Sequence, residues 1–325
     1  MCTAITYQTN NLYFGRNLDL HFSYDERVTV TPRCYPFQFR NGKVLENHHA
    51  MIGMATISEG YPLYYEATNE KGLSLAGLNF PTNATYYPAK DGMDNIAPFE
   101  LIPWILGQCA TVSEALTKIK NLNLWKEPYS QQFPLSPLHW LLADQCKSIV
   151  LEPLADGLHV VENPVGVLTN NPPFEYHMYN LANHLNLTAQ IPQNRFSEKI
   201  SINPYSLGMG AIGLPGDLSS GSRFVKAAFT KLNSCNGDSE SQSISQFFHI
   251  LGSVCQQRGL TTVGKNEFEY TIYSSCCNTN TGIYYYTTYE NSQICAVGMY
   301  NEDLDSEELI SYPLIKEKRI HMQNG

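Results

Sequence analysis

The chain has no long apolar stretch and comparatively few basic residues. No run approaches the roughly 18 apolar residues that a transmembrane helix needs. Lys and Arg number 21 against 30 Asp and Glu, which gives a formal net charge of −9. Because an acidic chain repels a phosphate backbone, we expect neither a membrane nor a nucleic acid as a partner.

The N-terminal segment also lacks a secretory pattern. No basic region opens it, and polar residues such as Thr6, Gln8 and Thr9 interrupt any apolar core. We therefore expect the mature protein to begin at residue 1 or 2 and to remain in the cytoplasm.

The cysteines show no framework for disulfides or zinc. There are nine, an odd number, with no C-x-x-C pair and no Cys or His pair at zinc spacing. We therefore expect neither a disulfide scaffold nor a metal.

Nucleotide and serine-hydrolase motifs are weak or absent. Walker A and G-x-S-x-G do not occur. Residues 208–213 match G-x-G-x-x-G, but "SINPYS" before them is no buried strand and "LPGD" after them is no helix start. A glycine-rich loop is the better interpretation, and no cofactor is predicted.

The composition is that of a globular, β-rich protein. Hydrophobic residues make up 43% and charged residues 16%, and 21 tyrosines contribute to an aromatic content of 12%. Aromatic side chains favour strands and the walls of a cleft.

Strand patterns lie near both ends of the chain. Residues 2–8 and 12–20 flank a turn at Asn10-Asn11 and predict a hairpin. Further strands are predicted over 26–33, on both sides of a turn within 61–81, within 138–154, and three times in succession over 269–300.

Helical patterns occupy the middle of the chain. They cover 97–110, 111–122, a segment after the strand and turn that open 166–185, a capped helix over 219–234, and a helix from 241 that we expect to end at Gly259. Residues 125–137 are predicted to be a loop. Segregated strands and helices, with no linker or repeat, predict an α+β fold with one domain over residues 1–325.

Cys2 is the first candidate for chemistry. If an aminopeptidase removes Met1, Cys2 carries both a thiol and a free α-amine. The amine, with a pKa of about 7.7–8.0, can accept the thiol proton without a histidine. The alternative is that Cys2 is one cysteine of nine and is buried by chance.

Four elements supply polar candidates that could surround Cys2. The predicted hairpin can bring Arg16 and Asp19 back beside the N-terminus, where they could order the thiolate and the amine. Asn79 and Asn170 each follow an apolar run, so that their amides could donate to an oxyanion. Arg223 lies in a helix's first turn, where a cation opposes the macrodipole, and this conflict indicates a functional position. Surface pairing and turn formation remain the alternatives for these residues.

These segments together resemble the choloylglycine hydrolases, the bile salt hydrolases and penicillin V acylases among the N-terminal nucleophile hydrolases. The resemblance extends over nearly the whole chain and rests on "MCT", "FGRNLD", "NEKGLSLAGLNFP", "LHW", "GVLTNNPPF", "GLPGDLSSGSRF", "QFFHIL" and "YTIYSSC". The opening and "FELIPWILGQ" are most similar to the bile salt hydrolases of lactobacilli.

The resemblance implies a role for each candidate. Cys2 corresponds to the nucleophile, and Arg16 and Asp19 to residues that order the thiolate and the amine. Asn79 corresponds to the oxyanion-binding or substrate-orienting amide, and Asn170 to the second such amide. Arg223 corresponds to the remaining functional arginine.

The resemblance also implies a fold and a substrate. The fold would be four-layer αββα, with two antiparallel sheets between helices, in a chain that assembles as a homotetramer. The reaction would release glycine or taurine from conjugated bile salts without metal or cofactor. Penicillin V acylases carry tyrosine where this chain has Asn79, which favours bile salts. The predicted substrate pocket comprises Leu18, Tyr24, Tyr65, Asn79, Phe133, Leu135 and Leu138, each of which could instead be routine packing.

Three alternatives remain open at this point. The chain could be a penicillin V acylase or another N-acyl amide hydrolase, a thiol redox sensor, or a ligand-binding protein with an incidental cysteine.

Overall fold

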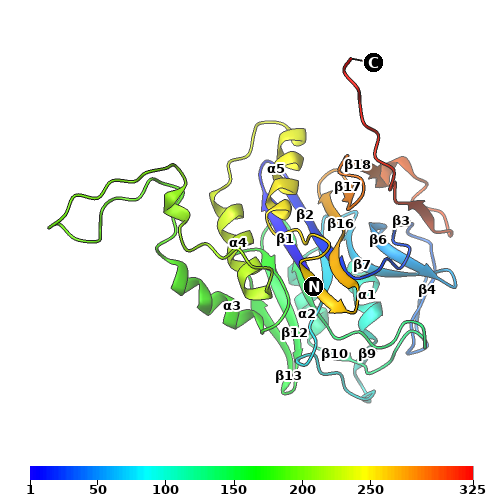
Figure 1. Ribbon diagram of the computed structural model, residues 1–325. Coiled ribbons are helices and arrows are strands. Elements are labelled where there is room, and N and C mark those ends of the chain that lie inside the picture. The colour runs from blue at the N-terminus through cyan, green and yellow to red at the C-terminus, as the bar shows by residue number, and fades with distance from the viewer. Residues whose placement is uncertain (325) are drawn as a thin grey trace.

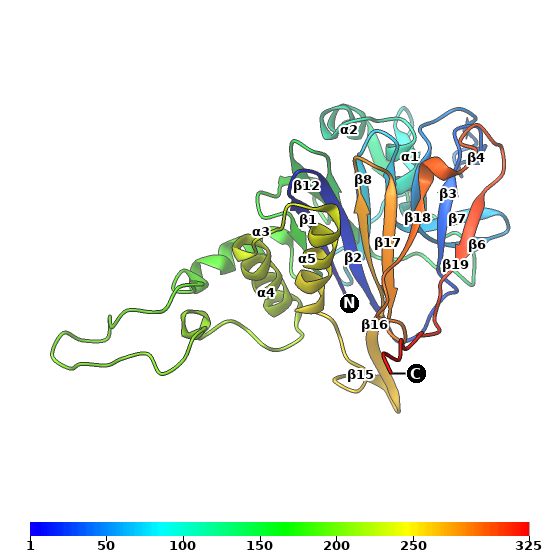
Figure 2. The ribbon, with the colours of Figure 1, turned by 90° about the horizontal axis from the view of Figure 1, so that it is seen from above.

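Two large antiparallel sheets form the centre of the protein in the computed structural model, which describes residues 1–324 (Figures 1 and 2). The first sheet contains, in spatial order, β14 (Val167–Leu168), β1 (Cys2–Gln8), β2 (Leu12–Leu20), β16 (Glu267–Asn278), β17 (Ile283–Thr288) and β18 (Cys295–Gly298), with β15 (Thr261–Gly264) paired to β16. The second contains β13 (Gly157–Glu162), β12 (Ser148–Leu154), β11 (Leu138–Ala143), β8 (Ser74–Asn79), β7 (Tyr61–Asn69), β6 (Met51–Ser58), β3 (Arg27–Thr31) and β19 (Ile310–Pro313).

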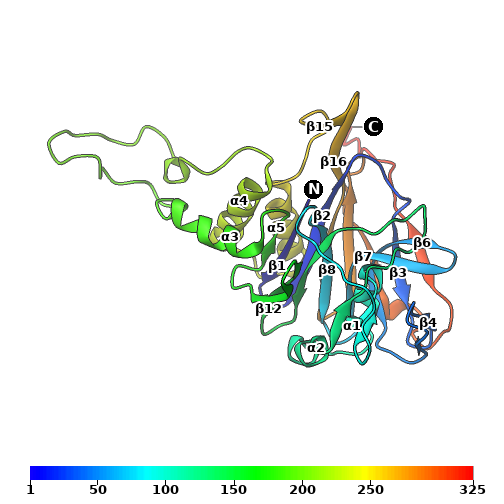
Figure 3. The same cartoon turned by 90° about the horizontal axis from the view of Figure 1, so that it is seen from below.

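Helices cover the outer face of each sheet. α4 (Ser220–Asn233) and α5 (Glu240–Gly252) pack on the first sheet, where Phe224 and Phe247 are buried in one cluster with Ile5. α1 (Leu101–Leu106) and α2 (Val112–Ile119) cover the second sheet, as Figure 3 shows from below. The order helix, sheet, sheet, helix is the four-layer α+β arrangement that we predicted.

Short elements complete the chain. They are the strand pairs β4 (Phe37–Gln38) with β5 (Val44–Leu45) and β9 (Asp94–Ile96) with β10 (Leu122–Leu124), the helix α3 (Phe174–Asn180), and 3₁₀ turns at Pro98–Glu100, Leu181–His184, Met209–Ala211 and Met299–Asn301. In the described part of the chain, no helix has both the length and the apolarity to cross a bilayer.

The N-terminal hairpin is confirmed, and both of its strands are buried almost throughout. β1 and β2 pair antiparallel, with Cys2 opposite Leu18 and Gln8 opposite Leu12. The strands predicted within 26–33, 61–81, 138–154 and 269–300, the short strand that opens 166–185 and the capped α4 also form, with Ser219 accepting a hydrogen bond from the Ser222 amide at the start of α4. Burial on both faces is expected where layers cover both sides of a sheet.

The end predicted for the helix after residue 241 is wrong. α5 ends at Gly252 rather than Gly259. The following segment turns toward β16, because the Gln256 amide donates to Thr271 Oγ1 (2.9 Å) and the Thr271 amide donates to the Gln256 carbonyl (3.1 Å). These long-range bonds replace the helical ones.

An arm, residues 181–218, leaves the layered body between α3 and α4 (Figures 1 and 3). It contains the glycine-rich segment 208–213, which forms a loop around one 3₁₀ turn rather than a nucleotide-binding strand and helix. Its most exposed apolar side chains are Leu185 (85%), Phe196 (83%), Tyr205 (85%) and Leu207 (82%).

Candidate active site

Cys2 begins β1 and lines a cavity that is partly open to solvent. The residue is 3% exposed, and it lines this cavity together with Arg16 and Leu18. Its backbone nitrogen donates to Asn170 Oδ1 (2.7 Å). Met1 is attached in the structure, so this nitrogen belongs to an amide here.

The hairpin register brings Asp19 beside the N-terminus. The Met1 amine donates to the Asp19 carbonyl (2.9 Å), and the Asp19 amide donates to the Met1 carbonyl (3.0 Å). The Met1 amine also forms an ion pair with Glu269 on β16. Burial lowers the pKa of the Met1 amine, while the charges of Cys2 and Asp19 act to raise it.

The Asp19 carboxyl is fully buried and held by the segment after α5 and by β16. Thr271 Oγ1 donates to Oδ1 (2.6 Å), and Gln256 Nε2 lies 3.5 Å from Oδ2. Burial raises the pKa of Asp19, and the Arg223 charge acts in the opposite direction.

Arg16 is fully buried between the two sheets. Its Nη1 donates to the carbonyls of Tyr65 (3.2 Å) and Gly77, and its Nε lies 3.8 Å from Glu66 Oε2. Burial disfavours the charged guanidinium, yet the pKa of Arg16 is raised, because Cys2 and other acidic groups nearby favour the cation. The side chain is thus fixed as a cation beside Cys2.

The contacts of Arg223 explain why a cation occupies the first turn of α4, where the helix dipole disfavours it. The first turn delivers its guanidinium to the N-terminus, where Nη1 donates to the Cys2 carbonyl (2.5 Å) and Thr3 Oγ1 (2.7 Å). Nη2 donates to Asn170 Oδ1 (2.8 Å). Burial lowers the pKa of Arg223, and Asp19 and Cys2 oppose that effect.

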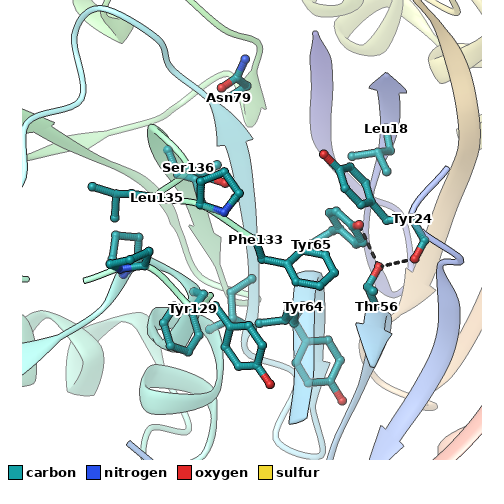
Figure 4. Close-up of a pocket in the computed structure, with 18 of the residues that line it drawn as sticks. Leu18, Tyr24, Thr56, Tyr64, Tyr65, Asn79, Tyr129, Phe133, Leu135 and Ser136 are labelled. Carbon is teal, nitrogen blue, oxygen red and sulfur yellow. Dashed lines mark hydrogen bonds between the residues drawn. The ribbon is translucent and has the colours of Figure 1, made fainter. Parts of the chain in front are cut away.

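The two asparagines in "TNN" have different surroundings. Asn170 is buried, and its Nδ2 donates to the Asn79 carbonyl (2.6 Å) while its Oδ1 accepts from Cys2 and Arg223. Asn171 instead donates to the Pro81 carbonyl. Asn79 lies at the end of β8 with an exposed side chain on the cavity lining (Figure 4). Asn170 is therefore the asparagine that contacts Cys2.

The cavity has a volume of about 320 Å³ and mostly apolar walls. All the residues predicted for a substrate pocket line it: Leu18, Tyr24, Tyr65, Asn79, Phe133, Leu135 and Leu138. Figure 4 shows the Tyr65 hydroxyl bonded to Thr56 Oγ1 (2.9 Å), which donates to the Tyr24 carbonyl (3.1 Å). Thr56 therefore connects two of the predicted pocket residues, Tyr24 and Tyr65, by hydrogen bonds.

Several lining residues were not predicted. Phe99 comes from the 3₁₀ turn Pro98–Glu100, Ile102 from the start of α1, Tyr129 from the loop 125–137, and Trp140 from β11. Tyr129 packs against Phe133 with ring centroids 6.1 Å apart. The loop's aromatic content was the one signal that could have indicated Tyr129.

Fold and site together define an amide hydrolase with a cysteine at the head of a buried strand. The family model for linear amide C–N hydrolases, choloylglycine hydrolase family, matches residues 2–312, and the chain belongs to this family.

Related proteins of this family align with the chain over its whole length. The chain is 57% identical over 324 residues to a bile salt hydrolase/transferase of Lactiplantibacillus plantarum, and 37% identical over 330 residues to one of Clostridium perfringens, with 100% of each chain covered in both cases.

Solved structures of related enzymes share the fold of this chain. A mutant conjugated bile acid hydrolase from Clostridium perfringens superposes with a TM-score of 0.93 at 36% identity, covering 100% of both chains. A penicillin V acylase from Agrobacterium tumefaciens shares the fold, with a TM-score of 0.73 at 18% identity over 95% of this chain and 90% of the other.

Proposed function

We propose that this protein hydrolyses the amide bond that joins a bile acid to glycine or taurine. The observation that carries the proposal is that Cys2 lines a mostly apolar cavity of about 320 Å³ and lies beside two buried arginines, Arg16 and Arg223. The names of the relatives, bile salt hydrolase/transferase, support the same substrate class.

Removal of Met1 prepares the nucleophile. The Cys2 nitrogen then becomes an α-amine, which accepts the thiol proton as the thiolate attacks the substrate carbonyl carbon. Asn170 Oδ1, 2.7 Å from this nitrogen, and the buried Asp19 carboxyl orient and stabilise the amine.

The amide bond breaks in two steps. Attack forms a tetrahedral intermediate, whose oxyanion accepts hydrogen bonds from the Asn79 amide and the backbone. The protonated Cys2 amine donates its proton to the leaving nitrogen, which departs as glycine or taurine. Water, deprotonated by the same amine, then cleaves the thioester and releases the bile acid.

The two arginines have separate roles in this proposal. Arg16 lines the cavity and stabilises the thiolate by its charge. Arg223 holds the Cys2 carbonyl and the Asn170 oxygen in place at 2.5 and 2.8 Å, and so fixes the direction of β1 at its first residue.

The cavity wall suits a steroid. Leu18, Phe133, Leu135 and Leu138 offer apolar surface, while Tyr24 and Tyr65 add polar groups. With Asn79 at the rim, this wall favours bile salts over penicillin V as the better substrate.

We further propose that the chain forms one domain over residues 1–325, acts in the cytoplasm and assembles as a homotetramer. The large apolar side chains exposed along the arm support assembly with further copies, because burying them against another chain would remove apolar surface from water.

The test is a substrate panel on protein freed of Met1. Glycocholate, taurocholate and penicillin V are compared by kcat/KM, with released glycine or taurine measured directly. We expect turnover of both bile salts above that of penicillin V, and near-complete loss in a folded Cys2→Ser variant. Higher kcat/KM for penicillin V would contradict the substrate class, and no amide cleavage at all would contradict the proposed function.

A further inference from the structure

Glu66, on β7, places a carboxylate in the core behind Arg16. The residue is 1% exposed, and it is not among the residues that line the cavity. A buried carboxylate is costly unless donors satisfy it, so its position requires an explanation.

Three hydroxyls from the opposite sheet satisfy this carboxylate. Tyr284 and Ser275 donate to Oε1 (2.5 and 2.9 Å), and Tyr273 donates to Oε2 (2.8 Å). Ser275 acts as the donor because its oxygen also accepts from the Arg16 amide (3.2 Å). Glu66 therefore links β7 to β16 and β17 at the level of Arg16.

The guanidinium of Arg16 is fixed on three sides. Nη1 is occupied by the Tyr65 and Gly77 carbonyls, Nε is directed to the Asn17 carbonyl (3.4 Å), and Glu66 Oε2 lies 3.8 Å from Nε. Among residues 1–324, no hydrogen-bond acceptor for Nη2 is found, and Arg16 lines the cavity beside Cys2. The open nitrogen is thus available to the reacting groups.

The charged side chains buried beside Cys2 and behind Arg16 include two of each sign. Arg16 and Arg223 contribute two positive charges, and Asp19 and Glu66 two negative ones, all four side chains being essentially inaccessible. Removing one member changes the electrostatic potential at Cys2, because water screens buried charges only weakly.

We propose that Glu66 is a positioning residue that orients the Arg16 guanidinium and offsets part of its charge toward Cys2. The inference deepens the function proposed above and rests on it for the role of Arg16. Burial raises the pKa of Glu66, while Arg16 and the three hydroxyls favour the ionised form.

Few titratable or charged groups face Glu66 or Cys2. Glu66 is approached by Arg16 of β2, Tyr273 and Cys277 of β16 and Tyr284 of β17. Cys2 is approached by Arg16, Arg223 and the N-terminal amine, and Asp19 is in turn close to all three. Each of these groups can be changed singly.

The test is the pH profile of Cys2 alkylation by iodoacetamide in Met1-free protein. Mass spectrometry of the N-terminal peptide separates Cys2 from the other eight cysteines. In Glu66→Gln, Arg16 is no longer offset, so the thiolate is favoured and the profile's midpoint falls by about one pH unit. With glycocholate, kcat falls about tenfold, because Arg16 is no longer held in its orientation at Cys2. The KM stays within about twofold, because Glu66 does not line the cavity.

A second variant and a control accompany this test. The double change Tyr273→Phe and Tyr284→Phe removes two donors to the Glu66 carboxylate and should move the midpoint in the same direction, which keeps the test decisive if Glu66→Gln does not fold. Tyr7→Phe removes a buried hydroxyl that has no partner in the described chain, and should leave the midpoint unchanged.

The outcomes separate the two proposals. A midpoint that is unmoved or raised in folded Glu66→Gln, or in the double variant, would overturn the role of Glu66. A lowered midpoint in a protein whose wild type cleaves no bile salt would support Glu66 and contradict the proposed function instead.

Discussion

At the scale of single residues, Arg223 shows how one guanidinium organises the site. It contacts four acceptors: the carbonyls of Cys2 and Leu218, Thr3 Oγ1 and Asn170 Oδ1. A lysine has the charge but cannot meet four acceptors in one plane, so substitution leaves buried oxygens unpaired.

We predict that Arg223→Lys lowers kcat/KM for glycocholate about 100-fold, since the nucleophile is no longer held in place. Steady-state kinetics measure the effect, with circular dichroism to establish folding. Arg258→Lys, which changes an exposed arginine beside Glu290, is the control and should turn over normally. Activity of Arg223→Lys within twofold of wild type would be inconsistent with this role.

Glu100 provides a pH-dependent test away from Cys2. Its carboxylate is inaccessible and accepts from the amides of Ala97 (2.9 Å) and Arg40 (2.6 Å). Burial raises the pKa of Glu100 to about 7, above its ordinary value of 4.5, although these amides act to lower it.

The folded state therefore binds a proton that the unfolded state releases between about pH 4.5 and 7, so stability falls as pH rises through this window. We compare the free energy of unfolding of wild type with that of Glu100→Gln. We predict that wild type loses about 2–3 kcal/mol relative to the variant between pH 4.5 and 8, because each unit of pKa shift corresponds to about 1.4 kcal/mol. Urea denaturation at several pH values measures the difference. A difference independent of pH would show that Glu100 titrates normally.

At the scale of elements, β2 and β16 approach closely enough to exclude any side chain at one position. A Cβ atom added at Gly15 would overlap the Ser275 carbonyl and lie 2.9 Å from Cys276 Cα, both backbone atoms of β16. The pairing that brings Arg16 and Asp19 to Cys2 therefore requires glycine here.

We predict that Gly15→Ala destabilises the protein by about 3 kcal/mol or more, because the two strands must separate. Gly221→Ala in α4 is the matched control: nothing lies within 4 Å of its added Cβ, and it should be neutral or stabilising by up to about 1 kcal/mol. Thermal unfolding compares the two, and equal stability of both variants would argue against the close packing.

The same elements show what the sequence could and could not predict. The hairpin and the capped α4 have local signals, namely a turn between alternating strands and a serine before a helix. β6 has none, because "MIGMATIS" is buried on both faces over most of its length and does not alternate. The early end of α5 depends on Thr271, which is distant in sequence.

The site divides in the same way. Cys2, Arg16 and Asp19 lie on one predicted hairpin, and Arg223 was indicated by its conflict with the helix dipole. The role that we propose for Glu66, on the other hand, could not be predicted from the sequence, because it depends on contacts with β16 and β17. Single strands do not reveal which buried polar residues will meet across two sheets.

At the scale of the whole molecule, the arm is the part that the layered body does not bury. We predict that the chain, of 36.6 kDa, has four times this mass in solution, and that Phe196→Asp with Leu207→Asp reduces it. Light scattering after size exclusion gives the masses. Ile320→Asp changes an exposed apolar residue outside the arm, so it is the control and should retain the assembly. A wild-type mass of 36.6 kDa would contradict assembly, and an unchanged mass in the arm variant would contradict the arm's part in it.

The most direct test of an N-terminal nucleophile is to compare the protein with and without Met1. The attached methionine makes the Cys2 nitrogen an amide, which can still donate to Asn170 Oδ1 but cannot accept a proton. Protein is prepared from cells with active or inhibited methionine aminopeptidase, each N-terminus is identified by mass spectrometry, and glycocholate turnover is measured on both forms. We predict that the Met1-free form is active and that the Met1-retaining form is folded but slower by about 10²–10⁴-fold, which is the usual contribution of a general base. Full turnover in a preparation shown to retain Met1 would contradict the Cys2 amine as the base.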